Sequence, residues 1–422
     1  MESREKALLE AVAALEPRML EFAGRLVAQP STLGQEAGAL AVMEGELTSL
    51  GWPTERVAVD PVALGAHPGF GPLERDQAGR YNVVATRPAD APGGRAALFN
   101  GHLDVVSPEP LEQWTKDPFA PRVEDGWLHG RGAGDMKGGV AAMTYALAAV
   151  ERAGLGLKAS VSVEGVIEEE CTGNGALACL LAGHDAPAVL IPEPFGPSIL
   201  THQVGVLWFK VSVGGVPSHV LNTGGGVNAI EKCFTLIQAL RGLEAEMNQR
   251  PLPGYDPLAH PLNLNIGIIA GGDWPSTVPA RAEFNGRLGY APGQTFAQVR
   301  AQVEQALARA AQADPWLAAN PPSLEFYGFR SDGFALERAA EPVLGLLNDC
   351  HRQLSGQDAP SYSATCTTDC RAFNLYGAGT ATCYGPVAQN IHAGDERVNI
   401  ASMVQVAKVY ALFLARWCGL AE

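Results

Sequence analysis

The segment ALFNGHLDVV, residues 97–106, begins as an apolar strand and ends on two polar side chains, His102 and Asp104. Because side chains alternate between the two faces of a strand, these two point to one side and Leu103 points to the other. An imidazole and a carboxylate at the end of a buried strand add nothing to packing. The segment therefore predicts a sheet strand that carries a functional site at its carboxyl end.

Segments of the same kind lie on both sides of this strand in the sequence and alternate with amphipathic helices. The strands are short, continuous apolar runs, which is typical of strands buried on both faces. This alternation indicates an α/β fold with a mostly parallel sheet and helices on both faces. The expected strands are 81–86, 96–101, 159–167, 188–193 and 380–386, and the expected helices are 4–28, 35–51, 137–154, 173–183 and 399–417.

The pattern changes at residue 206, where the strand VLWFKVSVGG begins. From there the order of elements is βαββαβ, which is typical of an α+β ferredoxin-like unit. A chain of 422 residues is too long for one typical core, so two domains are expected. We therefore expect a discontinuous α/β domain made of residues 1–205 and 328–422, interrupted by a smaller domain at 206–327.

Composition excludes several functional classes. The formal net charge is -15, and no cluster of Lys and Arg is present, so we expect no nucleic-acid binding. No stretch approaches the roughly 20 apolar residues of a membrane span, so we expect no membrane contact. The N-terminus carries charges at once and lacks the apolar core of a signal peptide, and the eight cysteines are scattered. Reduced thiols of this kind favour a cytoplasmic location.

Polar side chains follow several of the predicted strands, where ligands gather in open α/β sheets. They are two histidines and several carboxylates, which would raise one another's pKa if they converged without a cation. Imidazole nitrogen with carboxylate oxygen, and no thiolate, suits zinc or another borderline divalent ion. Five ligands that share one carboxylate would support two ions roughly 3.5 to 4 Å apart. These residues are His102, Asp104, Asp135, Glu168, Glu169, Glu170, Glu193 and His392.

The same segments carry a family resemblance that runs in order along nearly the whole chain. GHLDVV, WTKDPFAPRVEDGWLHGRGAGDMKGG, EEECTGNGA, PEP, GGVPSHVLNTGGGVNAI and GPVAQNIHAGDERVNI resemble motifs of one dizinc metallopeptidase and deacylase family. That family includes acetylornithine deacetylase, to which the chain is most similar overall, succinyl-diaminopimelate desuccinylase, carboxypeptidase G and aminoacylase. The resemblance implies a zinc-peptidase-like catalytic domain and an inserted lid that also forms a homodimer.

The resemblance also implies a role for each site residue. One metal ion would be held by His102, Asp135 and Glu193, and the other by Asp135, Glu170 and His392. The ions would be zinc, with cobalt as the alternative. Asp104 would orient the His102 ring through its free N–H, Glu169 would be the general base for a metal-bridging water, and His219 would reach the active site of the neighbouring subunit. A cis peptide bond is expected between Asp135 and Met136.

Substrate selection is implied at two further positions. Arg287 matches an arginine that binds a substrate carboxylate, and Thr367 lies where relatives contact the substrate. The segment QVG, 203–205, lacks the arginine that the desuccinylases carry there. The expected reaction is hydrolysis of the amide bond of an N-acyl amino acid or related small N-acyl amine. The alternatives are a dipeptidase, carboxypeptidase or desuccinylase with the same site, and a non-catalytic binding protein with the same fold.

Overall fold

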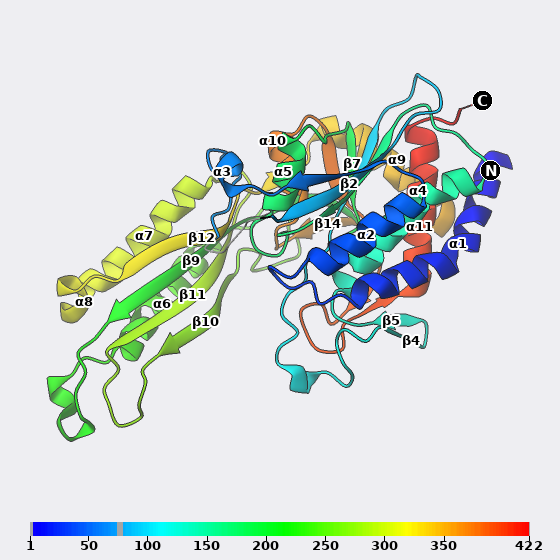
Figure 1. Ribbon diagram of the computed structural model, residues 1–422. Helices are drawn as coiled ribbons and strands as arrows, with labels where there is room; N and C mark the ends of the chain where they lie inside the picture. Colours follow the sequence, from blue (N-terminus) through cyan, green and yellow to red (C-terminus); the bar gives the residue numbers. More distant parts are fainter. Residues whose placement is uncertain (1–2, 74–78, 422) are drawn as a thin grey trace.

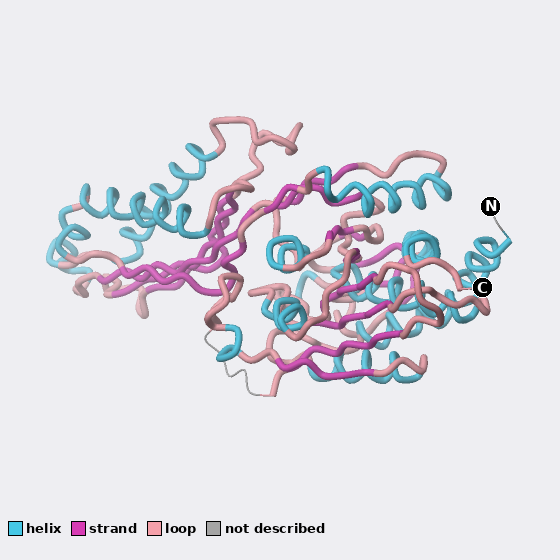
Figure 2. The backbone as a smooth tube through the Cα atoms, turned by 90° about the horizontal axis from the view of Figure 1, so that it is seen from above, coloured by secondary structure: helices cyan, strands magenta, loops and turns pink. Residues whose placement is uncertain are grey.

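The computed structural model describes residues 3–73 and 79–421, which form a broad larger part and an elongated smaller part (Figure 1). Both ends of the chain lie close together on the larger part, at the side away from the smaller part (Figures 1 and 2). The larger part is therefore built from both ends of the sequence, and the smaller part is inserted between them.

A six-stranded sheet forms the centre of the larger part, in the order β1-β2-β6-β3-β7-β15. Strands β6, β3, β7 and β15 are parallel, and β1 and β2 extend the sheet in antiparallel pairing. The predicted α/β class is confirmed, with the parallel strands at the positions expected from their apolar runs. The bounds are β1 Thr54–Ala58, β2 Tyr81–Arg87, β3 Ala97–His102, β6 Val161–Val166, β7 Ala188–Ile191 and β15 Thr380–Cys383.

Helices cover both faces of this sheet (Figure 2). A Cβ at Gly101 of β3 would lie 2.8 Å from Val140 Cγ2, so this glycine lets helix α4 approach the strand closely. On the opposite face the Asn82 side chain donates to the carbonyl oxygen of Gly175 in α5 at 2.8 Å. Burial on both faces explains why the strands are apolar throughout. The helices are α1 Ser3–Val27, α2 Ala37–Ser49, α3 Pro61–Leu64, α4 Gly138–Arg152, α5 Asn174–Leu181, α9 Glu341–Ser355, α10 Cys370–Tyr376 and α11 Ile400–Trp417.

The smaller part is a four-stranded antiparallel sheet, ordered β10-β11-β9-β12, with α6 and α7 packed on one face. This order is that of a ferredoxin-like unit, as predicted. Helix α7 begins with a capping box, in which Thr295 and Gln298 each accept the other's backbone N–H. The sheet runs from 205 to 331, while the domain limits 206 and 327 stay a prediction. The bounds are β9 Gly205–Gly214, α6 Ala229–Met247, β10 Leu264–Gly271, β11 Arg281–Tyr290, α7 Phe296–Ala313, α8 Pro315–Ala319 and β12 Ser323–Ser331.

Two small sheets were not expected from the sequence, because their strands are too short to show a periodic pattern. One joins β13, β8 and β14, and the other joins β16, β17, β5 and β4. The second sheet supports the segments that carry Asp135 and His392. The bounds are β4 Arg122–Glu124, β5 Trp127–His129, β8 Ile199–Gln203, β13 Phe334–Ala335, β14 Ser361–Ala364, β16 Ala388–Gln389 and β17 Arg397–Asn399.

Helix α11 is apolar on nearly all sides because it lies in the core. It is the one helix in the described part of the chain whose length and composition would suffice to cross a membrane. Most of its length is buried inside the protein, against α4, α1 and α9. A buried core helix can have the same length and apolar composition as a membrane-spanning helix.

A buried carboxyl group in the central sheet makes the stability of the fold depend on pH. Glu164 of β6 is fully buried, and the Asn100 side chain donates to its Oε2 at 2.9 Å. Burial, together with the charge of Asp369, raises the pKa of Glu164 to about 8. The folded state therefore holds a proton that the unfolded chain releases near pH 4.5, its usual value.

We predict that the Glu164→Gln variant loses less stability than the wild type between pH 5 and pH 8. Above the unfolded pKa, ionisation favours the unfolded chain by about 1.4 kcal/mol per pH unit until the pH reaches the folded pKa. The difference in unfolding free energy between the variant and the wild type should therefore grow from pH 5 to pH 8 in favour of the variant. Urea unfolding at each pH measures this, and a constant difference would contradict it.

Candidate metal centre

Three parallel strands deliver functional side chains to one edge of the central sheet. His102 is the last residue of β3, Glu169 and Glu170 follow β6, and Glu193 follows β7. Strands β6, β3 and β7 are neighbours, so their carboxyl ends lie together. Polar side chains that follow separate strands in the sequence thus come together at one edge of an open α/β sheet.

Asp135 and His392 come to the same edge from segments supported by the small sheet β16-β17-β5-β4. Asp135 lies in the irregular turn Ala133–Lys137, between β5 and α4, and His392 lies in the loop between β16 and β17. The peptide bond between Asp135 and Met136 is cis, as expected. Residues more than 250 positions apart in the chain thus meet at one site.

The Asp135 carboxylate lies between the two imidazoles. Its Oδ1 is 3.0 Å from His102 Nε2, and its Oδ2 is 3.4 Å from His392 Nε2. On the far side, His392 Nε2 is 3.2 Å from Glu170 Oε2. Each oxygen of one carboxylate therefore faces a different imidazole, which is the arrangement that a shared ligand of two ions requires.

Two further carboxylates complete the cluster on the His102 side. His102 Nε2 is 3.9 Å from Glu169 Oε2 and 4.0 Å from Glu193 Oε1. Ligand atoms of His102, Glu169 and Glu193 all lie within 4.8 Å of one another, as do those of His102, Asp135 and Glu170. The cluster thus offers nitrogen and oxygen atoms at the spacing of a metal site.

The charges of this cluster call for a cation. Burial raises the pKa of Glu169 well above its usual value, and the charge of Glu193 acts in the same direction. Burial and the neighbouring Asp135 likewise raise the pKa of Glu193. Although burial opposes it, hydrogen bonds to Asp135 and Glu170 raise the pKa of His392 to about 10. Bound divalent ions would neutralise the carboxylates, and this mixed donor set fits zinc or a similar ion.

Asp104 lies beside His102, and its main chain comes closer to the imidazole than its carboxylate does. His102 Nδ1 is 2.9 Å from the backbone carbonyl oxygen of Asp104 and 3.8 Å from its Oδ1. The carboxylate instead accepts the backbone N–H groups of Glu169 at 3.3 Å and Glu170 at 3.1 Å. The imidazole is therefore oriented by the main chain of Asp104, and its side chain fixes the turn that carries two carboxylates.

Glu396 holds the Asp135 turn, and the sequence analysis did not single it out. It is fully buried, and its Oε1 accepts the backbone N–H groups of Gly134 at 2.8 Å and Asp135 at 2.9 Å. Its other oxygen accepts a hydrogen bond from the buried guanidinium of Arg131. In the sequence, Glu396 is one of two adjacent acidic residues in HAGDERVNI, 392–400. Its contact with the Asp135 turn is visible only in the fold.

Two residues of the site adopt the left-handed backbone conformation that favours glycine. Glu168 has φ 66° and His392 has φ 61°. Such positions cost of order 1–3 kcal/mol and persist when their surroundings fix them. Glu168 is fixed by an ion pair with Arg80 and by the Thr172 hydroxyl, which donates at 2.6 Å. It serves as a buried support for the neighbouring carboxylates.

A cavity of about 460 Å³ opens beside the cluster and is lined by Asp135, Glu169 and both residues predicted to bind substrate. Arg287 enters from β11 of the smaller part, and its Nη2 donates to the carbonyl oxygen of Thr365 at 3.0 Å. The Thr367 hydroxyl accepts a hydrogen bond from Gln203 Nε2 at 3.1 Å. Arg287 and Thr367 therefore lie at the site, while their roles stay predictions.

His219 lies outside this cavity. It immediately precedes the turn Val220–Gly225, at the end of the smaller part that is farthest from the central sheet (green, lower left in Figure 1). Its ring is exposed to solvent, and Nδ1 accepts the backbone N–H of Leu221 at 3.1 Å. Within one chain, the structure does not bring His219 to the cluster.

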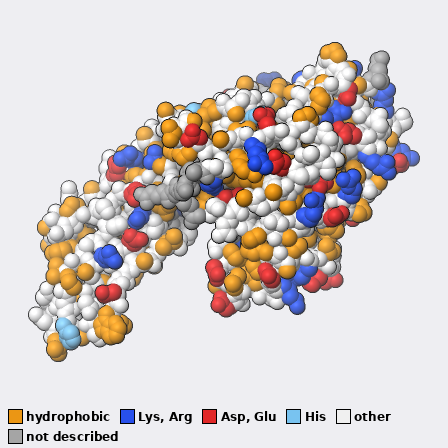
Figure 3. Space-filling view, viewed as in Figure 1, with side chains coloured by type: hydrophobic (Ala, Val, Ile, Leu, Met, Phe, Trp, Pro, Cys, Tyr) orange, Lys and Arg blue, Asp and Glu red, His pale blue; other side chains and the backbone are white. Residues whose placement is uncertain are grey.

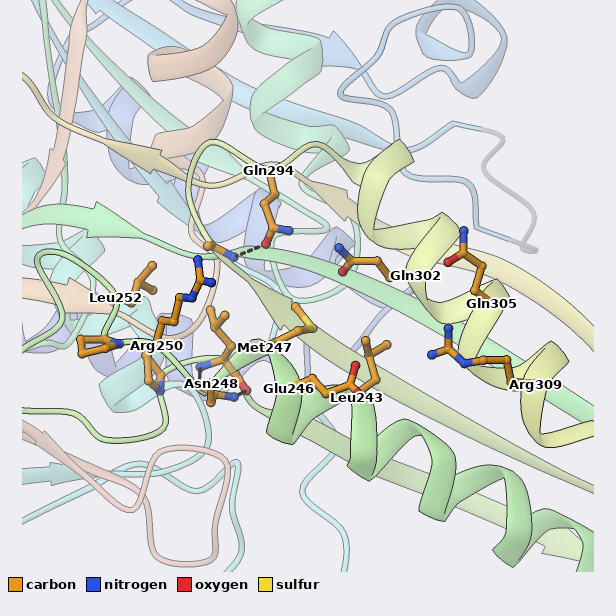
Figure 4. Close-up of a pocket in the computed structure, with 14 residues that line it drawn as sticks. Leu243, Glu246, Met247, Asn248, Arg250, Leu252, Gln294, Gln302, Gln305 and Arg309 are labelled. Carbon is orange, nitrogen blue, oxygen red and sulfur yellow. Dashed lines mark hydrogen bonds between the residues drawn. The ribbon is translucent and has the colours of Figure 1, made fainter. Parts of the chain in front are cut away.

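A second cavity, of about 400 Å³, lies in the smaller part between α6 and α7 (Figure 4). Arg250 and Arg309 lie at opposite sides of it, with Gln294 and Gln302 between them (Figure 4). Glu246 is the one carboxylate among the described residues that line it. No histidine or cysteine is among its described lining residues, so this cavity lacks the imidazole donors of the first site.

A family model supplies the identification. The model of peptidase family M20/M25/M40 matches residues 98–416, which include every carboxylate and imidazole of the cluster as well as Arg287 and Thr367. The chain belongs to this family. Membership of peptidase family M20/M25/M40 makes the protein a metal-dependent hydrolase, so the prediction of an enzyme is confirmed and the non-catalytic alternative falls.

Curated relatives within the family include two kinds of amide hydrolase. N-formyl-4-amino-5-aminomethyl-2-methylpyrimidine deformylase of Halalkalibacterium halodurans is 28% identical over 347 residues, covering 77% of this chain and 80% of that protein. Succinyl-diaminopimelate desuccinylase of Rhodopseudomonas palustris is 27% identical over 414 residues, covering 95% and 98%.

Solved structures match the fold along the whole chain. The dipeptidase Dug1p of Saccharomyces cerevisiae superposes with a TM-score of 0.78 at 15% identity, and the match covers 100% of both chains. At this identity the likeness concerns the fold alone.

We predict that Glu396→Ala lowers the affinity for zinc by about 10- to 100-fold, because outer partners of metal ligands typically contribute on this scale. The matched control is Glu124→Ala, since Glu124 lies in β4 of the neighbouring small sheet and pairs with Arg122 rather than with the Asp135 turn. Competition with a chelator measures the affinity, and circular dichroism confirms the fold. An affinity equal to that of the control would contradict the role assigned to Glu396.

Proposed function

We propose that the protein hydrolyses the amide bond of a small N-acylated amine, with two divalent ions bound by the cluster. The observation that carries this proposal is the Asp135 carboxylate, whose two oxygens face His102 and His392. The ions would be zinc, with cobalt as the alternative. We assign one ion to His102, Asp135 and Glu193, and the other to Asp135, Glu170 and His392.

Bound divalent ions supply Lewis acidity and lower the pKa of water at such a site. Glu169 lies at the edge of the cavity, where its carboxylate accepts a proton from the attacking water and returns it to the leaving nitrogen. Asp104 holds the backbone of Glu169 in place. Arg287 offers N–H donors from the lid, and its planar fork suits a carboxylate or carbonyl group of the substrate.

The acyl group that this site accepts should be short and uncharged. Gln203 occupies the position where an arginine would be needed to bind an acidic acyl arm. Its side chain donates a hydrogen bond to the Thr367 hydroxyl and accepts one from the backbone N–H of Thr368. A formyl or acetyl group fits this environment better than a succinyl group. The deformylase relative, whose name specifies an N-formyl substrate, supports the same choice.

We propose that the protein forms a homodimer through the lid. The edge strand β10 is unpaired along one side and exposes Ile268 and Ile269, and Trp274 and Leu221 are exposed nearby. Apolar groups on an open sheet edge favour pairing with another chain. His219 lies at this end of the lid, beside Thr277, from which it would reach the partner's cluster. Sedimentation should give twice the 44.4 kDa of one chain, and a monomer with full activity would contradict this.

We propose a cytoplasmic location because the cysteines are free thiols. All eight are free thiols in the structure, and all but Cys366 are buried. A reducing compartment keeps such thiols in this form.

The assay that tests the proposed reaction compares N-formyl, N-acetyl and N-succinyl amines with dipeptides, after loading with zinc or cobalt. We expect release of free amine from the formyl and acetyl compounds. Faster cleavage of dipeptides would favour the peptidase alternative, and faster cleavage of succinyl compounds would favour the desuccinylase alternative.

We predict that Glu169→Gln lowers turnover by at least ~100-fold, because the amide side chain does not accept the proton of the attacking water. The zinc content should stay at the wild-type value, since Glu169 is assigned no metal ion. Elemental analysis and product release measure the two quantities. A Gln variant with near wild-type turnover would refute Glu169 as the base.

A further inference from the structure

The cavity between α6 and α7 has no part in the proposed reaction, and we call it the lid cavity. Its volume of about 400 Å³ lies in the range of small-molecule sites. It shares none of its described lining residues with the catalytic cavity. Leu243, Met247 and Leu262 supply apolar surface to it. A ligand of the lid cavity therefore contacts different residues from the substrate at the metal centre.

Two guanidinium groups reach the lid cavity from opposite sides, Arg250 from the segment after α6 and Arg309 from α7 (Figure 4). No ion pair or hydrogen bond joins either of them to another described residue. Glu246 is the one carboxylate in the described lining, so positive charge is in excess. The planar fork of a guanidinium suits a carboxylate. A single small anion reaches one side only, so a ligand that uses both arginines carries two separate carboxylates.

Two carboxamide groups lie between the guanidiniums (Figure 4). The Gln302 side chain extends from α7 into the lid cavity, and its Oε1 is buried and accepts no hydrogen bond from the described residues. A buried acceptor of this kind is costly unless a ligand supplies an N–H. Gln294 Oε1 accepts the backbone N–H of Ala291 at 3.3 Å, which leaves its amide nitrogen free to donate. One peptide group offers both an N–H for Gln302 and a carbonyl oxygen for Gln294.

The spacing along α7 sets the length of the ligand. Gln302 and Arg309 are seven residues apart, which is two helical turns, or about 10 Å at 1.5 Å per residue. An extended peptide advances about 3.3 Å per residue, so roughly three residues cover this distance. A ligand with a peptide group at Gln302 and a carboxylate at Arg309 is therefore elongated.

We propose that the lid cavity binds a short acidic peptide in extended form. Carboxylates at its two ends contact Arg250 and Arg309, and a peptide group between them contacts Gln302 and Gln294. The ligand is a free peptide, because the lid cavity has the volume of a small-molecule site. This binding uses neither the metal ions nor the residues of the proposed reaction.

The test is calorimetric titration of the zinc-loaded Glu169→Gln variant with N-acetyl-Glu-Ala-Ala-Glu, whose integrity is checked by chromatography. We expect saturable binding, at least about 10-fold tighter than that of the uncharged N-acetyl-Gln-Ala-Ala-Gln amide, since two partly exposed ion pairs contribute on this scale. Sebacate, an elongated dicarboxylate with no peptide group, should bind more weakly than the acidic peptide. Absence of binding, or equal affinity for the charged and uncharged peptides, would overturn the proposal.

Variants of the lining locate the bound peptide. Arg250→Gln and Arg309→Gln should each weaken binding by about 5-fold. Arg300→Gln is the matched control, because Arg300 also lies on α7 but pairs with Glu304 and does not line the lid cavity. Gln302→Leu should weaken binding of the peptide and leave that of sebacate unchanged. Equal affinities in the two lining variants and the Arg300 control would contradict the assignment.

Two further variants separate this site from the metal centre. Glu246→Gln should strengthen binding, because it removes the one carboxylate of the described lining. Arg287→Gln, in the catalytic cavity, should leave the affinity unchanged. Weakening by Arg287→Gln alone would place the peptide at the metal centre and overturn the proposal. The same affinity is expected without metal ions, so failure of the proposed reaction would leave these results unchanged.

Discussion

Carboxylates that repel one another gather at one edge of the central sheet, and the rest of the fold must accommodate them. Glu169 and Glu193 are buried there, and Asp135 and Glu170 are half-buried. Among the described residues of the cluster, two imidazoles accompany these four carboxylates. A protein that needed stability alone would not gather these groups. Their burial is compatible with the folded state when cations share the site, and the surrounding chain is arranged to hold the ligands for such ions.

Support for the ligands comes from residues that touch neither substrate nor metal ion in the proposed mechanism. Glu396 fixes the backbone of Asp135, and the Asp104 carboxylate fixes the turn of Glu169 and Glu170. Arg80 and Thr172 hold Glu168 in its left-handed conformation beside that turn. The rigid α/β part thus fixes the reactive groups, and the lid contributes Arg287 and Trp208 to the cavity wall.

Much of this site could be predicted from the sequence because strand ends in a parallel sheet converge by topology. In each case the apolar run predicts a strand. The polar residues after it, His102 after one strand and Glu169 and Glu170 after another, indicate the end that carries the site. The partner of the Asp104 side chain could not be predicted, because a main-chain contact to His102 and a side-chain contact have the same sequence pattern. Glu396 and the aromatic residues that line the cavity, such as Trp208 and Phe329, were missed for a related reason. Their contacts join segments that only the tertiary fold brings together, and a phenylalanine such as Phe329 has the same pattern whether it faces a core or a cavity.

Anomalous diffraction from crystals of the protein grown with zinc tests the two-ion site. We expect two anomalous peaks, one near His102 and Glu193 and the other near Glu170 and His392, with the Asp135 carboxylate between them. A single peak that leaves Asp135 without a metal contact, or zinc bound only elsewhere on the molecule, would contradict it.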